Sequence, residues 1–298
     1  QASNSGGQIY SEPRMMPLAG GVFGAPFVLP APSLPFWAQT YRTVAGDFDG
    51  DGLPDLAYAA SGHVLRNTGG FSFVAIETLR PAPTIANPVT SQAVPSLATL
   101  DVDVDGQDEL AYSFIAHNAA TASTELRRYA GGSPAGGFRI SEMYEGSLLA
   151  FDADGDGDRD LATTAARRLT VHLNDGAGGL VAAGPTLAPS NLSLRRHFGD
   201  VDADGDLDVL AVPETWAGSF FLFIGVNDGY GAFTWTRAAC PGLAQGSSGS
   251  AYGDSAVFDH GGDGDADLYV GGFHPPGQAS RDIVLVNGAR PDGARSRS

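Results

Sequence analysis

Residues 152–161 read DADGDGDRDL, and this segment decides the fold because near copies of it recur along the chain. The copies are DFDGDGLPDL from Asp47, DVDVDGQDEL from Asp101, DVDADGDLDV from Asp200 and DHGGDGDADL from Asp259. Their first Asp recurs at intervals of 54, 51, 48 and 59 residues. A fixed period of this length is typical of repeat architectures such as β-propellers, in which one repeat forms one blade.

The flanks of each segment predict strands. Short apolar runs lie on either side, as at 43–45 and 56–58, and a third run ends in an Asn-Gly-type turn, as at 67–69. Such turns need the positive φ that Asn and Gly tolerate. A fourth run begins near a Gly-aromatic pair, such as Gly137-Phe138. Four short strands per repeat predict an all-β protein, a β-propeller of five four-stranded blades, with six or more blades as the alternative.

The two ends of the chain suggest how the ring closes. The fifth repeat stops at residues 287–288 without a fourth strand, and residues 20–27 resemble the fourth-strand opening of the other repeats. We expect an N-terminal strand within 20–36 to complete the last blade, which removes exposed sheet edges. The alternatives are a Pro-rich lead-in or a degenerate sixth blade. The predicted domain is 20–290, with tails at 1–19 and 291–298.

The five segments, here named acidic loops 1 to 5, predict cation sites. Positions 1, 3, 5 and 9 are acidic and position 6 is Gly, except that Gly261 holds position 3 of loop 5. Alternate side chains on a tight loop converge, and calcium accepts the six to eight oxygens that such a loop offers, so we expect up to five calcium ions. The predicted ligands, with the carbonyl of position 7 included, are Asp47, Asp49, Asp51, Leu53 and Asp55; Asp101, Asp103, Asp105, Gln107 and Glu109; Asp152, Asp154, Asp156, Asp158 and Asp160; Asp200, Asp202, Asp204, Asp206 and Asp208; and Asp259, Asp263, Asp265 and Asp267.

A helix–loop–helix calcium hand begins in the same way but requires Glu at position 12. Here position 12 is Tyr58, Tyr112, Thr163, Ala211 or Val270, which excludes that motif.

The pattern Asp-x-Asp-x-Asp-Gly-x-x-Asp-Leu, followed by a strand, an Asn-Gly turn and Gly-Phe, resembles the FG-GAP family of integrin α-subunit propellers and secreted propeller lectins. The resemblance covers about residues 40–290, with departures at Glu109, Val209 and Gly261. It implies that each calcium loop joins the first and second strands of a blade. The family includes adhesion modules, lectins and non-catalytic attachments to enzymes, so the fold alone does not fix the function.

Charge and composition narrow the choice of partners. The net charge is −17, and 23 of the 34 acidic residues lie in the five loops, so the acidity is arranged as sites that repel nucleic acid. No apolar run approaches 18 residues, so we expect no membrane insertion. Cys240 is the only cysteine and cannot form an intrachain disulfide. The chain starts at Gln1 without a leader, which fits either removal of a leader on export or an internal start.

The variable links between blades and between second and third strands are the expected binding surface. Aromatic, His and Asn side chains suit sugars, although a single aromatic could instead pack between blades. We expect a secreted, non-enzymatic binding or adhesion module for carbohydrate or a surface glycoprotein, since no catalytic motif stands out. The alternatives are a structural subunit of an extracellular filament or surface layer that self-assembles through its tails, and a propeller-type lyase or hydrolase. The ligand-binding candidates are Trp37, His117, Asn118, Trp216 and His274.

Overall fold

The structure is a computed structural model, and its strands form two compact units. Unit 1 takes in residues 1–150, 158–165 and 174–181, unit 2 takes in the remainder, and the division runs through the third of the sheets described below. No helix in the described part of the chain has the length and apolarity to cross a membrane. The described residues are 3–5, 8–11, 14–19, 21–30, 34–35, 43–59, 62–79, 92–116, 122–141, 147–165, 168–187, 194–202, 204–213, 221–239, 252–260, 262, 266–272 and 283–287.

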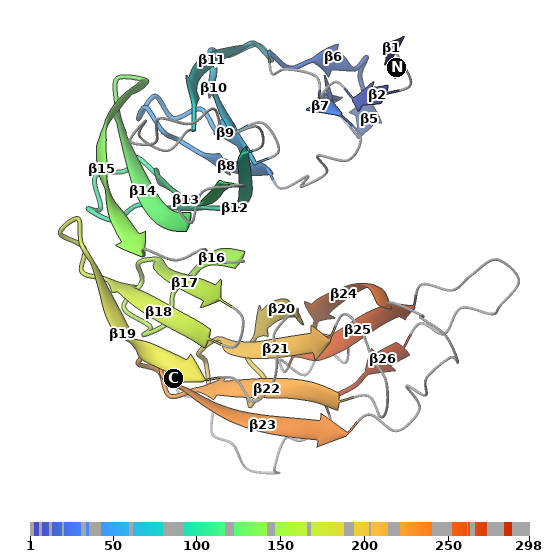
Figure 1. Cartoon of the computed structure of the whole chain (residues 1–298). Coiled ribbons are helices and arrows are strands. Elements are labelled where there is room, and N and C mark those ends of the chain that lie inside the picture. The colour runs from blue at the N-terminus through green and yellow to red at the C-terminus, as the bar shows by residue number, and fades with distance from the viewer. Residues whose placement is uncertain are drawn as a thin grey trace, which may run out of the picture. The chain divides into compact units, whose positions relative to one another are not determined.

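Five antiparallel sheets follow one another in chain order (Figure 1). Sheet 1 consists of β8 (Thr43–Gly46), β9 (Asp55–Tyr58), β10 (His63–Asn67) and β11 (Phe73–Thr78). Sheet 2 consists of β12 (Gln92–Leu100), β13 (Glu109–Ala116), β14 (Ala122–Ala130) and β15 (Ser133–Ser141). Sheet 3 consists of β16 (Ser147–Phe151), β17 (Asp160–Ala165), β18 (Arg168–Asn174) and β19 (Leu180–Leu187). Sheet 4 consists of β20 (Leu194–Gly199), β21 (Asp208–Pro213), β22 (Phe221–Asn227) and β23 (Phe233–Ala239). Sheet 5 consists of β24 (Tyr252–Phe258), β25 (Asp267–Gly272) and β26 (Ile283–Leu285).

Neighbouring strands in each sheet are also neighbours in sequence, so sheets 1 to 4 are four-stranded meanders, the unit from which propellers are built. The predicted four strands per repeat are therefore confirmed for the first four repeats. Each acidic loop joins the first and second strands of its sheet, as the FG-GAP resemblance implied. The Asn-Gly-type turns also take the expected backbone, since φ is 81° at Gly69, 61° at Gly176 and 76° at Gly229.

One register recurs at the base of the loops. The acid at position 9 pairs across the ladder with the residue directly before position 1. A slip by one residue would turn every side chain of a strand to the other face, so this constant register fixes which carboxylates face the loop. The four pairs are Gly46↔Asp55, Leu100↔Glu109, Gly199↔Asp208 and Phe258↔Asp267.

Apolar cores lie between consecutive sheets. In unit 1, Phe48 of loop 1 is fully buried and its ring centroid lies 5.5 Å from that of Tyr129 on sheet 2. A second cluster in unit 1 joins sheet 2 to Leu148 and Leu161 of sheet 3. In unit 2, Leu268 of sheet 5 packs with apolar residues of sheet 4. Full burial of one such side chain contributes about 1.5–3 kcal/mol, so these cores stabilise the contacts between neighbouring sheets.

Asparagines at the end of the third strand link consecutive sheets by hydrogen bonds. In sheets 3, 4 and 5 the side-chain Nδ2 of this residue donates to a backbone carbonyl in the acidic loop of the preceding sheet. We name these three residues the staple asparagines. Their bonds run from Asn174 to Asp101 (3.0 Å), from Asn227 to Ala153 (2.8 Å) and from Asn287 to Val201 (2.6 Å).

Sheets 1 and 2 depart from this pattern. Asn67 of sheet 1 donates instead to Pro54 of its own loop, at 3.0 Å. At the corresponding place in sheet 2 stands Tyr129, whose ring packs on Phe48 and whose hydroxyl donates to Glu77 Oε2 of sheet 1 at 2.9 Å. Sheet 2 therefore reaches its predecessor through an aromatic side chain.

The N-terminal segment forms short strand pairs. A strand within 20–36 was expected to complete the last blade; in the structure β4 (Leu18–Ala19) pairs with β5 (Val22–Phe23), β3 (Arg14–Met15) pairs with β6 (Phe27–Val28), and Phe27 packs against Phe71 and Phe73 next to sheet 1. In the described part of the chain, sheet 5 has three strands. Ring closure and the domain limits 20–290 stay predictions. The strands of this segment are β1 (Ser3–Ser5), β2 (Gln8–Ser11), β3 (Arg14–Met15), β4 (Leu18–Ala19), β5 (Val22–Phe23), β6 (Phe27–Val28) and β7 (Leu34–Pro35).

Replacing a staple asparagine tests how much its hydrogen bond to the preceding sheet contributes to the free energy of unfolding. Asn227 is 3 % exposed, and N227A should lower the free energy of unfolding by about 2–3 kcal/mol, because a buried hydrogen bond between sheets 3 and 4 is lost. N67A, whose lost bond stays within one sheet, should cost about 1 kcal/mol. Urea denaturation of both variants measures the difference. Equal losses would contradict the role of Asn227 between sheets.

Candidate metal sites in the acidic loops

Four of the acidic loops each bring three carboxylates together. In each group one oxygen from every residue lies within 4.8 Å of the others, which is the spacing that a single bound cation requires. The members are positions 1, 3 and 9 of the loop. The groups are Asp47, Asp49 and Asp55; Asp101, Asp103 and Glu109; Asp152, Asp154 and Asp160; and Asp200, Asp202 and Asp208.

The carboxylate at position 1 organises the loop through backbone N–H groups. In loop 1, Asp47 Oδ1 accepts from Gly50 at 2.8 Å and Oδ2 accepts from Gly52 at 2.7 Å. Loop 2 repeats the second bond, from Gly106 to Asp101 at 2.9 Å. The same bond recurs in loops 3 and 4. Position 6 is Gly because it takes a positive φ, which is 81° at Gly52.

The acid at position 9 is buried at the base of the loop, and two backbone N–H groups hold it. Asp55 is 0 % exposed, and it accepts from Phe48 at 3.0 Å and from Asn67 at 2.7 Å. The equivalent pair of bonds occurs in loops 4 and 5. Burial raises the pKa of Asp55 to about 6, and the neighbouring charges of Asp49 and Asp51 add to that shift. A cation would lower the cost of burying this charge.

Positions 5 and 7 were also predicted as ligands, but they are not members of the four groups. The position 5 side chain instead caps the loop, since Oδ1 of Asp51 accepts from the N–H of Leu53 at 2.9 Å. Asp105 and Gln107 form the same bond at 2.8 Å. Coordination by positions 5 and 7 therefore stays a prediction.

The residues present fit a hard cation. Oδ1 of Asp103, Asp154 and Asp206 is buried, and no hydrogen-bond donor reaches it within the described residues. A buried oxygen without a donor is costly, and a metal ion is one way to satisfy it. In loop 4, burial together with the neighbouring carboxylate of Asp204 raises the pKa of Asp206 to about 7. An all-oxygen set of carboxylates suits calcium or magnesium and not a soft transition metal.

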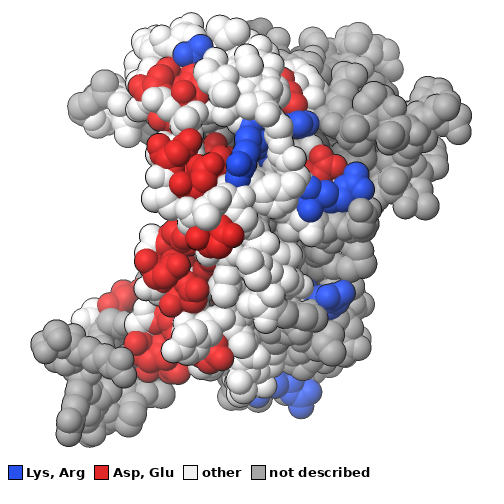
Figure 2. All heavy atoms as spheres, turned by 90° about the vertical axis from the view of Figure 1, so that its left-hand side faces the viewer, with Lys and Arg blue, Asp and Glu red and all other residues white. Residues whose placement is uncertain are grey.

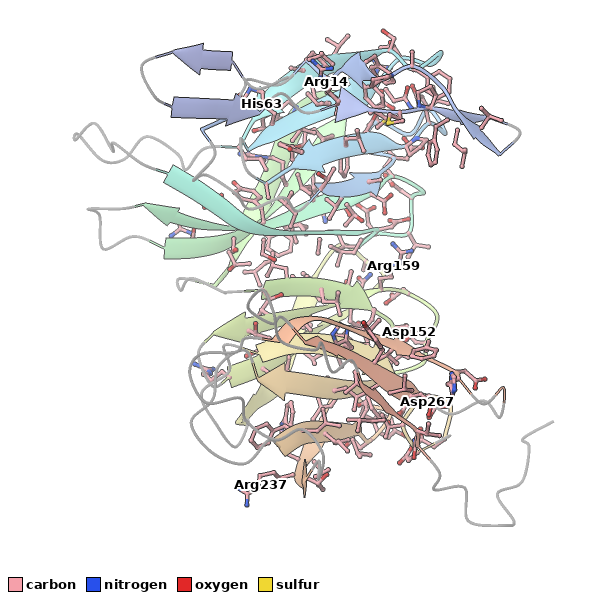
Figure 3. All side chains as sticks on the ribbon, turned by 90° about the vertical axis from the view of Figure 1, so that its right-hand side faces the viewer. Arg14, His63, Asp152, Arg159, Arg237 and Asp267 are labelled. Carbon is pink, nitrogen blue, oxygen red and sulfur yellow. The ribbon has the colours of Figure 1, made fainter. Side chains whose placement is uncertain are left out.

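Loop 5 is described only in part, because Gly261, Asp263 and Asp265 lie outside the described residues. Its base matches the others: Asp267 is 1 % exposed and accepts from His260 at 2.6 Å. Figure 3 labels Asp152, which directly follows β16, and Asp267, which begins β25, so each lies where a strand meets its acidic loop. Whether loop 5 forms a site stays a prediction.

The ligand-binding candidates in the variable links cannot be placed. Trp37, His117, Asn118, Trp216 and His274 all lie outside the described residues.

Three features of the sites were not predicted from the sequence. Arg66 and Arg128 form ion pairs with loop carboxylates, and Asp108 Oδ2 accepts from the N–H of Asp47 in the preceding loop at 2.9 Å. The staple asparagines were read only as turn residues. The staple asparagines follow position 9 by 14, 19 and 20 residues, so alignment of the repeats on that position does not align them, and their hydrogen-bond partners lie on other sheets.

These sheets and loops define a class: an all-β repeat protein in which four described repeats carry an acidic hairpin loop with the geometry of a metal site. The FG-GAP-like repeat family matches residues 47–112 and 152–211. The chain thus contains FG-GAP-like repeats, and the resemblance predicted from its motifs is confirmed.

Among solved structures, the chain is similar to a lectin of Agrocybe aegerita, described for its specific recognition of non-reducing terminal N-acetylglucosamine. The TM-score is 0.52 at 14 % sequence identity, over 83 % of this chain and 66 % of that chain. The match therefore spans just under two thirds of the lectin, and at this identity the likeness concerns the fold alone. No curated protein sequence matches the chain.

Position 4 of loop 2 provides a test of loop strain. Val104 has φ 54°, a left-handed conformation that a β-branched residue rarely adopts, whereas Gly50 and Gly155 hold the same position in loops 1 and 3. V104G should raise the free energy of unfolding by about 1 kcal/mol, because the relieved strain exceeds the entropy cost of glycine. Val181 is similarly exposed but lies in strand β19, so V181G should instead destabilise. Denaturant titration compares the two, and a loss of stability in V104G would contradict the strain.

Proposed function

We propose that the chain is a secreted, calcium-stabilised β-propeller that acts as a non-enzymatic binding module for carbohydrate. Its ring would have five blades, with residues from 20–36 closing the last. The observation that carries the calcium part is the repeated group of three carboxylates at positions 1, 3 and 9. The FG-GAP-like repeats support the propeller, and consecutive sheets that share cores are consistent with it.

Calcium suits these loops better than magnesium does. Magnesium demands a near-ideal octahedron, whereas calcium accepts irregular sets of six to eight oxygens. The loops offer carboxylates held by backbone N–H groups at unequal depths, from the buried Asp208 to the exposed Asp202. In the absence of an ion these carboxylates repel one another, so a bound cation would favour the folded loop.

The ions would have a structural role. Position 1 fixes the loop backbone and position 9 joins the loop to the third strand. Ligands from both ends of the loop would tie the first two strands of a sheet together, and the backbone of loop 1 is bonded to loop 2 from Asp108 N to Asp47 O at 2.8 Å. Calcium bound in one loop would therefore also stabilise the contact with the next sheet.

Carbohydrate is the proposed ligand class for two reasons. The sequence places Trp, His and Asn in the variable links, and these side chains stack on sugar rings and bond hydroxyl groups. A solved structure of similar fold is a lectin, which supports the class without transferring its specificity.

A filament or surface-layer subunit is the second candidate. Within the described residues β26 pairs only with β25, so sheet 5 ends at β26. A strand from another copy could extend such an edge. Light scattering at micromolar concentration separates the two candidates, because a monomer that binds glycan would contradict the filament.

Calcium should raise the thermal stability of the protein. At millimolar calcium each site of about 0.1–1 mM affinity adds about 1 kcal/mol or more, so the unfolding midpoint should rise by about 5–10 °C over the value in chelator. D202N removes a position 3 carboxylate and should reduce the rise, while D228N, in the β22–β23 turn, should leave it unchanged. An equal midpoint with calcium and with chelator would refute calcium stabilisation.

A glycan array with and without calcium tests carbohydrate binding. We expect binding to a restricted set of glycans, with N-acetylglucosamine-terminated glycans included among the probes. W216A and H274A should weaken the signal at least tenfold. Y230A changes a 76 % exposed aromatic in the β22–β23 turn, outside the variable links, and should have no effect. Silence across neutral and charged glycans would overturn the carbohydrate assignment and leave the calcium assignment standing.

A further inference from the structure

Acidic loops 1 and 2 each contain a positive charge that comes from the third strand of the sheet. Arg66 of β10 forms an ion pair through Nε with Asp49 Oδ2, and its Nη2 lies 3.5 Å from Asp51 Oδ2. Arg128 of β14 places Nη1 3.7 Å from Asp103 Oδ2. Both arginines therefore reach the position 3 carboxylate, which is a member of the candidate metal group.

The two arginines occupy equivalent positions. In sheet 1 Leu56 pairs with Leu65, the residue before Arg66, and in sheet 2 Leu110 pairs with Arg127, the residue before Arg128. The two arginines therefore hold the same place in their sheets, and each guanidinium lies against the acidic loop of its own sheet.

A hairpin of the following sheet covers each arginine. A side chain at Gly132 would come within 3.2 Å of Arg66 Cδ, and one at Gly178 within 2.6 Å of Arg128 Nη2. Arg128 also donates from Nη2 to the carbonyl of Gly178 at 2.7 Å. The backbone of the next hairpin lies against each guanidinium and holds it beside the loop.

Loop 4 is the contrast. In sheet 4 Val209 pairs with Gly225, so Val226 stands where the arginines stand in sheets 1 and 2. In sheet 3 the residue before the staple asparagine is Leu173, which is also apolar and lies against Gly231 of the next hairpin. Loop 4 also has Asp206 at position 7, where loops 1 and 2 have Leu53 and Gln107.

The distribution of charge on the surface agrees with this difference. On the face shown in Figure 2, Arg side chains (blue) lie beside acidic groups (red) in the upper part, whereas the acidic groups lower down have no blue beside them.

We propose that Arg66 and Arg128 are built-in counter-ions, so that loops 1 and 2 keep their shape without calcium and bind it more weakly than loop 4. A positive charge already shares Asp49 or Asp103, and a calcium ion placed in the same group meets its repulsion. Loop 4 has five carboxylates and no such partner from its third strand, so it depends on the ion. This inference rests on the proposed calcium binding and assigns unequal roles to the sites.

The test uses calorimetric calcium titration together with thermal unfolding in calcium and in chelator. R66M and R128M keep the long apolar stem and remove the charge, so each should tighten calcium binding at one weak site about tenfold. Each should also lower the unfolding midpoint more in chelator than in calcium. R139M is the matched control, because Arg139 is exposed on β15 and faces Glu125 at 3.8 Å instead of a loop, and it should change neither measurement.

V226R supplies the converse test and does not depend on removing an existing ion pair. It should weaken one tight site about tenfold and reduce the rise in midpoint caused by calcium. If R66M and R128M leave calcium affinity unchanged and lower the midpoint equally in both conditions, the arginines are structural and the inference is overturned. In that case calcium binding by the wild-type chain still stands. If the wild-type chain binds no calcium, the inference and the calcium assignment are both overturned.

Discussion

A buried carboxylate at the base of each acidic loop sets the register of the strands and the shape of the loop. Asp55, Asp160 and Asp208 are 0 % exposed, and such a group is costly unless its oxygens accept hydrogen bonds. The N–H of position 2 bonds Asp55 and Asp208 from within the loop, and the N–H that ends the third strand bonds all three carboxylates. One side chain thereby joins the loop and the third strand, and the constant ladder register follows from the need to place it there.

The charges around this carboxylate have to be compensated, and the loops differ in what lies beside those charges. In loops 1 and 2 an arginine covered by the next hairpin lies against the position 3 carboxylate. In loop 4 the corresponding residue is Val226, and the pKa values of Asp202 and Asp206 are raised to about 6 and 7 by burial and by mutual repulsion. Loops with the same backbone geometry can therefore differ in how much they are stabilised by a cation, because the residue that differs, arginine or valine, lies on the third strand.

Much of the fold could be predicted from residue type and spacing. The Asp-x-Asp-x-Asp-Gly segments located the first hairpin of each repeat, and the Asn-Gly turns located the hairpin between the third and fourth strands in sheets 1, 3 and 4. The strand that closes the ring stays a prediction: residues 20–27 share the composition of a fourth strand, and in the structure β5 pairs with β4, β6 pairs with β3, and Phe27 packs beside sheet 1. Composition indicates that a segment will form strands, but the choice of partner depends on which edge it can reach.

Residue type and spacing alone predicted the repeat, its short strands and the carboxylates of the acidic loops, because these depend on local periodicity and on a loop shorter than ten residues; the choice of positions 1, 3 and 9 came from the folded loop. Only the tertiary structure decided that Asn227 bonds to Ala153, that Tyr129 packs on Phe48, and that an arginine of the third strand lies in loops 1 and 2. These contacts join residues of different strands or sheets, and their formation depends on how sheets pack and not on the order of residues within a repeat.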